Sequence, residues 1–108
     1  MIDAIIHGKL HKKPVARTSS NGNPFVTASV RVSVDNGDAM FASVIAFDKS
    51  ACMALAALDD GDTVALSGSL TPKVWTPKEG DPRPAIDFVA HVVTTAYHVK
   101  RKRQAMTE

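Results

Sequence analysis

Two phenylalanine rings stand six residues apart in the segment Met-Phe-Ala-Ser-Val-Ile-Ala-Phe, residues 40–47. Successive side chains of a β-strand point to opposite faces, so Phe41 and Phe47 share one face, roughly 20 Å apart at ~3.3 Å per residue. The other face carries Met40, Ala42, Val44 and Ala46, which are apolar enough to form the core. Aromatic rings spaced along an exposed sheet form a platform for unpaired bases. The alternative is that both rings belong to the core.

Basic side chains near these rings could contact phosphates. Arg31 lies in the segment 25–34, where Val26, Val30 and the other alternate apolar residues face the opposite way. The most basic stretch of the body holds Lys9, Lys12, Lys13 and Arg17, which are either phosphate contacts or a solvated strand edge. Trp75 is out of phase with the apolar residues of its own segment, as a stacking residue would be.

Five strands and one helix are expected to position these residues. The strands are predicted at residues 2–18, 25–34, 40–47, 63–75 and 85–97. Gly8 and Gly68 suggest bends, and Pro14 suggests an edge or a break. In the last strand, the inward side chains are predicted to be Ile86, Phe88, Ala90 and Val92.

A short helix is expected over residues 49–58, with Asp48 as its N-cap and Gly61 beyond its end. Ala51, Leu55 and Leu58 would form its buried stripe. Five strands with a helix between the third and fourth indicate an all-β OB-fold barrel. That architecture binds oligonucleotides across its second and third strands, where Arg31, Phe41 and Phe47 lie.

Length and composition favour one soluble domain, residues 1–99, followed by a basic tail at 100–108. The chain has 108 residues, 44% of them hydrophobic, with no apolar run near the ~20 residues that span a bilayer. A single cysteine and an N-terminus unlike a signal peptide lead us to expect a cytoplasmic protein. The last nine residues hold four basic side chains and one acid, which leaves the body with nine basic and ten acidic ones.

The sequence indicates no catalysis. It contains no nucleophile elbow, phosphate loop or pair of carboxylates framing a cleft. The run Asp59-Asp60-Gly61-Asp62 lacks the ligand spacing of a calcium loop, and the four histidines lack zinc spacing. We therefore expect neither enzymatic activity, nor a metal, nor a cofactor.

The ordered segments resemble the bacterial single-stranded DNA-binding (SSB) family over residues 4 to about 95. The resemblance is carried by Ala4-Ile-Ile-His-Gly-Lys-Leu10 with Pro14 and Arg17, by Asn21-Gly22, by Phe41-Ala-Ser-Val-Ile-Ala-Phe47-Asp-Lys49, by residues 60–70, and by Lys73-Val-Trp-Thr76 with Gly80. It implies base stacking on Phe41, Phe47 and Trp75. It also implies contacts from Lys73, Lys49 and Arg17 to the nucleic-acid backbone.

This sequence departs from the family pattern at several positions. The second hairpin is reduced to residues 35–38 without an aromatic residue, and Ser43 and Val74 replace basic residues. The chain ends in Lys-Arg-Lys-Arg-Gln-Ala-Met-Thr-Glu rather than in a long tail with an acidic tip, so recruitment of replication proteins through such a tip is in question.

The resulting hypothesis is a sequence-tolerant single-stranded DNA-binding protein of replication, recombination or repair, with RNA binding left open. The family also implies a homo-oligomer, a tetramer or a dimer, for which Ile45 and Val89 are candidate interface residues. The chain is also similar to the primosomal replication protein N (PriB) family, which serves replication restart. A third alternative is an OB-type module whose apolar face binds another protein.

Overall fold

The computed structural model describes residues 2–33, 39–76, 78 and 80–95. Within these ranges the chain forms a sheet of six strands and one helix. The elements are β1 (Ile2–Leu10), β2 (Val15–Thr18), β3 (Pro24–Ser33), β4 (Ala39–Ala46), α1 (Lys49–Ala56), β5 (Thr63–Trp75) and β6 (Arg83–Thr95). The hairpin at 35–38, Tyr97, the basic tail and the side chain of Trp75 lie outside this description.

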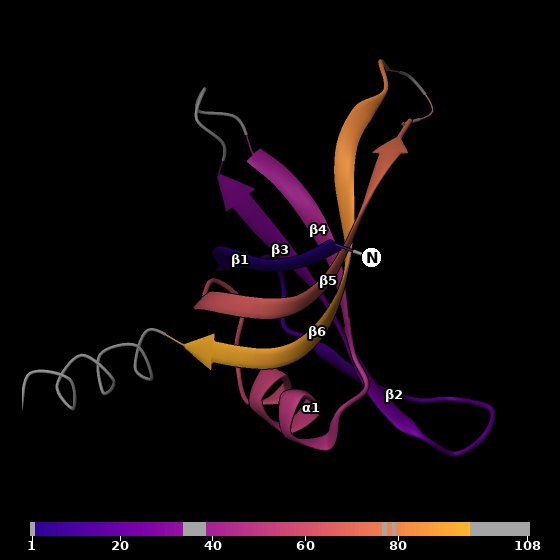
Figure 1. Ribbon diagram of the computed structural model, residues 1–108, viewed down its shortest axis with the longest axis vertical. Coiled ribbons are helices and arrows are strands. Elements are labelled where there is room, and N and C mark those ends of the chain that lie inside the picture. The colour runs from indigo at the N-terminus through magenta and orange to yellow at the C-terminus, as the bar shows by residue number, and fades with distance from the viewer. Residues whose placement is uncertain (1, 34–38, 77, 79, 96–108) are drawn as a thin grey trace, which may run out of the picture.

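The strands close into a barrel in the order β1-β5-β6-β4-β3-β2 (Figure 1). Closure comes from a second pairing of β1, where Lys9 and Leu10 lie opposite Arg31 and Val30 of β3. Neighbouring strands are antiparallel except β4 and β6, which are parallel. This closed arrangement is the predicted all-β OB-fold, with a helix between the third and fourth predicted strands.

The predicted first strand over residues 2–18 is wrong in one respect, because it is divided into β1 and β2. Lys12 has a left-handed backbone with φ 74°, and Pro14 has no N–H for a sheet hydrogen bond. The Lys12 N–H donates to Asp60 Oδ1 at 2.9 Å instead of to a neighbouring strand. The chain therefore leaves the sheet after Leu10, and β2 then pairs with β3.

A β-bulge in β6 overturns the prediction that Val92 faces inward. Ser67 pairs with Val92 and Gly68 pairs with Ala90, so His91 is an extra residue on β6. One extra residue reverses the alternation of faces. Val93 is therefore buried, whereas Val92 is 55% exposed.

The helix α1 packs against one end of the barrel and ends at Ala56, two residues before the predicted end. Ala51 and Leu55 are buried as expected, with Cys52 beside them, and Leu58 is half-buried. Asp48 occupies the N-cap position, but its side chain makes no capping hydrogen bond. The Asp48 carboxylate instead lies 3.3 Å from His91 Nδ1 on β6.

The core lies inside the barrel and beneath α1. Its fully buried large side chains are Phe88, Leu55, Leu66, Val30 and Val64. Ala42, Val44 and Ala46 of β4 are also buried, as predicted for the inner face of that strand, whereas Met40 at its start is half-buried. At the closure point, Gly8 is required because a Cβ there would overlap the carbonyl oxygen of Arg31.

Beyond the barrel, β5 and β6 continue as a two-stranded arm, defined here as residues 71–75 and 83–87 (Figure 1). Lys73 lies on this arm, opposite Ala85. The described residues form no helix with the length and apolar character needed to cross a membrane.

Candidate nucleic-acid interface

The outward faces of β3, β4 and β6 form the candidate interface. The strand pairing aligns their side chains in rows across the sheet: Arg31 with Phe41, Ser29 with Ser43 and Asp87, and Thr27 with Ile45 and Val89. Both predicted rings of β4 face solvent, Phe41 at 45% exposure and Phe47, just past the strand end, at 58%. The alternative that these rings belong to the core is therefore wrong.

One end of this face, the Phe41 end, consists of His11, Arg31 and Phe41. The His11 ring meets the Phe41 ring edge-on, with their centroids 5.5 Å apart. Arg31 is exposed and lies directly across from Phe41 in the β3–β4 register. An aromatic ring and a guanidinium side by side can contact a base and its phosphate.

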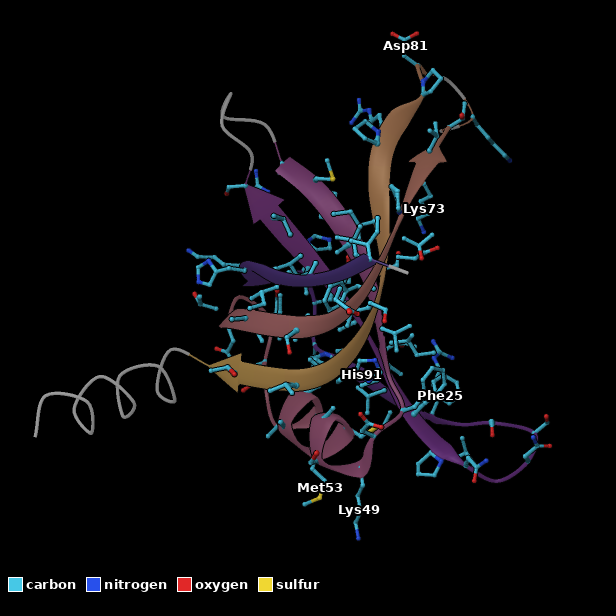
Figure 2. All side chains as sticks on the ribbon, viewed as in Figure 1. Phe25, Lys49, Met53, Lys73, Asp81 and His91 are labelled. Carbon is cyan, nitrogen blue, oxygen red and sulfur yellow. The ribbon has the colours of Figure 1, made fainter. Side chains whose placement is uncertain are left out.

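The other end, the Phe47 end, consists of Arg17, Phe25, Phe47 and Lys49. The Phe25 and Phe47 ring centroids are 6.3 Å apart with the planes tilted by 42°. Arg17 of β2 pairs with Phe25, and Lys49 follows Phe47 as the first residue of α1. Arg17 and Lys49 are both exposed. In Figure 2 both Phe25 and Lys49 are distant from the tip of the β5–β6 arm, and the Lys49 side chain extends away from Phe25 below α1.

A shallow groove of about 600 Å³, called here the central groove, lies between the two ends. Its floor comes from β3, β4 and β6, and its wall from the connection between β1 and β2. The lining residues are His11, Lys12, Lys13, Val15, Thr27, Ala28, Ser29, Ser43, Val44, Ile45, Asp87, Phe88 and Val89. The predicted interface residues Ile45 and Val89 are half-buried neighbours on this floor.

Two predicted phosphate contacts, Lys13 and Lys73, already have acidic partners. The Lys13 ammonium donates to Asp59 Oδ1 at 2.9 Å, with both side chains largely exposed. Lys73 Nζ donates to Asp87 Oδ1 at 2.6 Å and lies 3.5 Å from Ser43 Oγ. Exposed pairs of this kind are worth at most about 1 kcal/mol, so a phosphate can compete for these lysines.

The structure thus brings Phe41 and Arg31 together at one end, and Phe47 and Arg17 at the other, with Lys49 two residues after Phe47 at the start of α1. Lys12 and Lys13 line the central groove, and Lys73 lies beside it on the arm. Trp75 ends β5, where its backbone pairs with Arg83. Its stacking role stays a prediction, because its side chain lies outside the described part of the chain.

Sequence reasoning missed two aromatic members of this face. Phe25 has the same strand phase as Arg31, so alternation could have identified it. His11 follows the end of β1, where alternation no longer applies, and its contact with Phe41 depends on the barrel closure.

A comparison with protein-family models matches residues 1–96 to the "Single-strand binding protein family". The chain belongs to this family. Membership confirms the predicted resemblance and the prediction of single-stranded DNA binding on an OB-fold. No curated protein sequence matched the chain.

Two solved structures show the same fold as this family member. A small single-stranded DNA-binding protein from Streptomyces coelicolor is 27% identical, with a TM-score of 0.69 over 87% of this chain and 93% of that one. Rim1, a mitochondrial single-stranded DNA-binding protein from S. cerevisiae, is 16% identical, with a TM-score of 0.65 over 88% of this chain and 94% of that one. At its lower identity, Rim1 supports the fold alone.

Proposed function

We propose that single-stranded DNA runs along β4 from the Phe41 end to the Phe47 end, crossing the central groove. The observation that carries this path is the exposure of Phe41 and Phe47, 45% and 58%, at opposite ends of one strand. Bases stack on the two rings, while Arg31 at one end and Arg17 and Lys49 at the other contact phosphates. Stacking tolerates every base, so the binding is not sequence-specific.

The remaining predicted residues extend this path. Lys12 and Lys13 contact the DNA strand from the wall of the central groove, and Lys73 contacts it from the arm. Trp75 stacks a further base. The protein acts by binding without catalysis, in the processes that expose single strands during replication, recombination or repair. The buried free thiol of Cys52 supports the cytoplasm as its compartment.

A titration of a fluorescein-labelled oligo-dT with the protein tests this proposal. We expect fluorescence anisotropy to rise on binding, the single tryptophan to be quenched, and an equal length of duplex to bind more weakly. The affinity should fall as salt rises, because each neutralised phosphate releases counterions. Absence of binding at low salt would contradict the proposal and favour the protein-interaction module.

We also propose that the protein is a homo-oligomer that associates through β1. Among the described residues, 2–8 pair with β5 on one side and have no strand on the other. Ile5 is 78% exposed and shares a row with Ser67 and the 55% exposed Val92. An unpaired strand edge beside exposed apolar side chains favours pairing with a second copy.

The oligomeric state also separates the two family hypotheses. A tetramer favours the SSB type, and a dimer favours the PriB type of replication restart. Light scattering on the full chain measures this state directly.

A further inference from the structure

Asp87 is the acidic residue among those that line the central groove. It lies on β6, in the row that also contains Ser29 and Ser43. Its side chain is 55% exposed on the face between the Phe41 and Phe47 ends. Asp87 therefore places a carboxylate on the proposed path of the phosphate backbone.

The Asp87 carboxylate forms an ion pair with the ammonium of Lys73. Their Nζ and Oδ1 atoms are 2.6 Å apart, and the Lys73 side chain is 37% exposed. The two residues are diagonal neighbours on one face of the β5–β6 arm, because Lys73 pairs with Ala85 and Thr71 with Asp87. Ser43 Oγ, 3.5 Å from Lys73 Nζ, completes the contact.

The ion pair neutralises the charge of Lys73, which would otherwise face the DNA strand. A phosphate that approaches Lys73 must displace Asp87 or share the ammonium with it, and it meets repulsion from the carboxylate in either case. Because the ion pair is exposed to water, its loss costs little, and DNA can exchange for it.

We propose that Asp87 competes with the DNA backbone for Lys73 and thereby lowers the affinity for single strands. This inference rests on the proposed function. It assigns to Asp87 the role of a residue that limits affinity at the edge of the central groove, and it makes Lys73 a phosphate contact only when Asp87 releases it.

The test is a double-mutant cycle of Lys73→Gln and Asp87→Asn, with labelled oligo-dT binding measured by anisotropy from 50 to 200 mM salt. At low salt we expect Asp87→Asn to bind roughly two- to fivefold more tightly, the range of an exposed ion pair. The slope of log affinity against log salt should steepen by about 0.7, one additional neutralised phosphate. Lys73→Gln alone should weaken binding, because it leaves the Asp87 carboxylate uncompensated beside the DNA, and the double variant should bind no more tightly than the wild type.

Three controls make the cycle specific. Asp81→Asn makes the same charge change at the tip of the arm, away from Lys73 in Figure 2, and should leave the affinity unchanged. Asp87→Thr, with a residue suited to strands, should reproduce the gain of Asp87→Asn. Oligo-dT and oligo-dC should gain equally, because a carboxylate that instead reads the cytosine amino group would make Asp87→Asn weaken oligo-dC.

Equal or weaker binding by Asp87→Asn, in a variant that melts as the wild type does, would overturn the proposal. A gain that persists in the double variant would also overturn it. If the wild type binds no single strand at all, the proposed function fails and this inference fails with it. Binding by the wild type without a gain on mutation contradicts the role of Asp87 alone.

Discussion

Individual side chains determine how the candidate interface would hold a strand. Phe41 and Phe47 each have a supporting ring, His11 at 5.5 Å and Phe25 at 6.3 Å between centroids. A ring packed against a second ring loses little further freedom when a base stacks on it. On the proposed path of the DNA, each end of the face would therefore offer a preformed stacking site rather than a loose side chain.

Arg31 tests the electrostatic part of this account. We expect Arg31→Gln to weaken single-strand binding at low salt and to reduce the slope of log affinity against log salt by about 0.7, because one fewer phosphate is neutralised. The measurement is an anisotropy titration at several salt concentrations. Arg31→Lys keeps the charge and should retain the wild-type slope. An unchanged slope in Arg31→Gln would show that Arg31 does not contact the backbone.

At this scale the sequence predicts side chains whose strand phase is regular. Alternation along β4 correctly separated Phe41 and Phe47 from the buried Ala42 and Val44. It could not predict the ion pair of Lys73 with Asp87. That pair depends on the register of β5 against β6, which is fixed by tertiary packing.

At the scale of elements, irregular positions shape the strands. The extra residue His91 changes which side of β6 faces the core, and Gly68 lies directly across from this bulge. A sequence pattern reveals a glycine but not the residue at which the partner strand gains a position. For this reason the sequence indicated an irregularity at Gly68, where the pairing with β6 shifts register, but wrongly predicted Val92 to be inward.

Gly68→Ala tests the close approach of strands at the bulge. A Cβ at this position would overlap the carbonyl oxygen of Val89, so β5 and β6 would have to move apart. We expect the free energy of unfolding to fall by about 1–3 kcal/mol, which thermal denaturation would register as a drop of several degrees.

Gly61→Asn is the matched control for this substitution. Gly61 has φ +88° and open space around its Cβ position, and asparagine tolerates such a backbone. Its melting temperature should fall less than that of Gly68→Ala. Equal stability of Gly68→Ala and the wild type would contradict the strand contact described here.

At the scale of the whole molecule, the order of elements was enough to predict the barrel. Five strand segments interrupted by one helix fit few architectures, and the OB-fold is one that closes. The division of the first segment at residues 11–14 was not predicted in full, although Pro14 suggested a break. The left-handed backbone of Lys12 and its bond to Asp60 depend on the α1–β5 connection, which is distant in sequence.

Ile5→Lys tests the proposed association through β1. A charge in place of the 78% exposed Ile5 should disfavour burial against a second copy. We expect light scattering to show a smaller particle than the wild type, approaching the 11.5 kDa of one chain. Met53→Lys, a similar change at an exposed apolar residue of α1, should keep the wild-type mass. An unchanged mass for Ile5→Lys would exclude β1 as the interface.

The most direct test of the central claim measures oligo-dT affinity for Phe41→Ala, Phe47→Ala and the double variant. Each single substitution should cost about 1–3 kcal/mol of binding free energy, the usual value of one stacked base. The two rings lie roughly 20 Å apart, so the costs should add in the double variant. A double variant that melts like the wild type and binds oligo-dT with wild-type affinity would contradict the account.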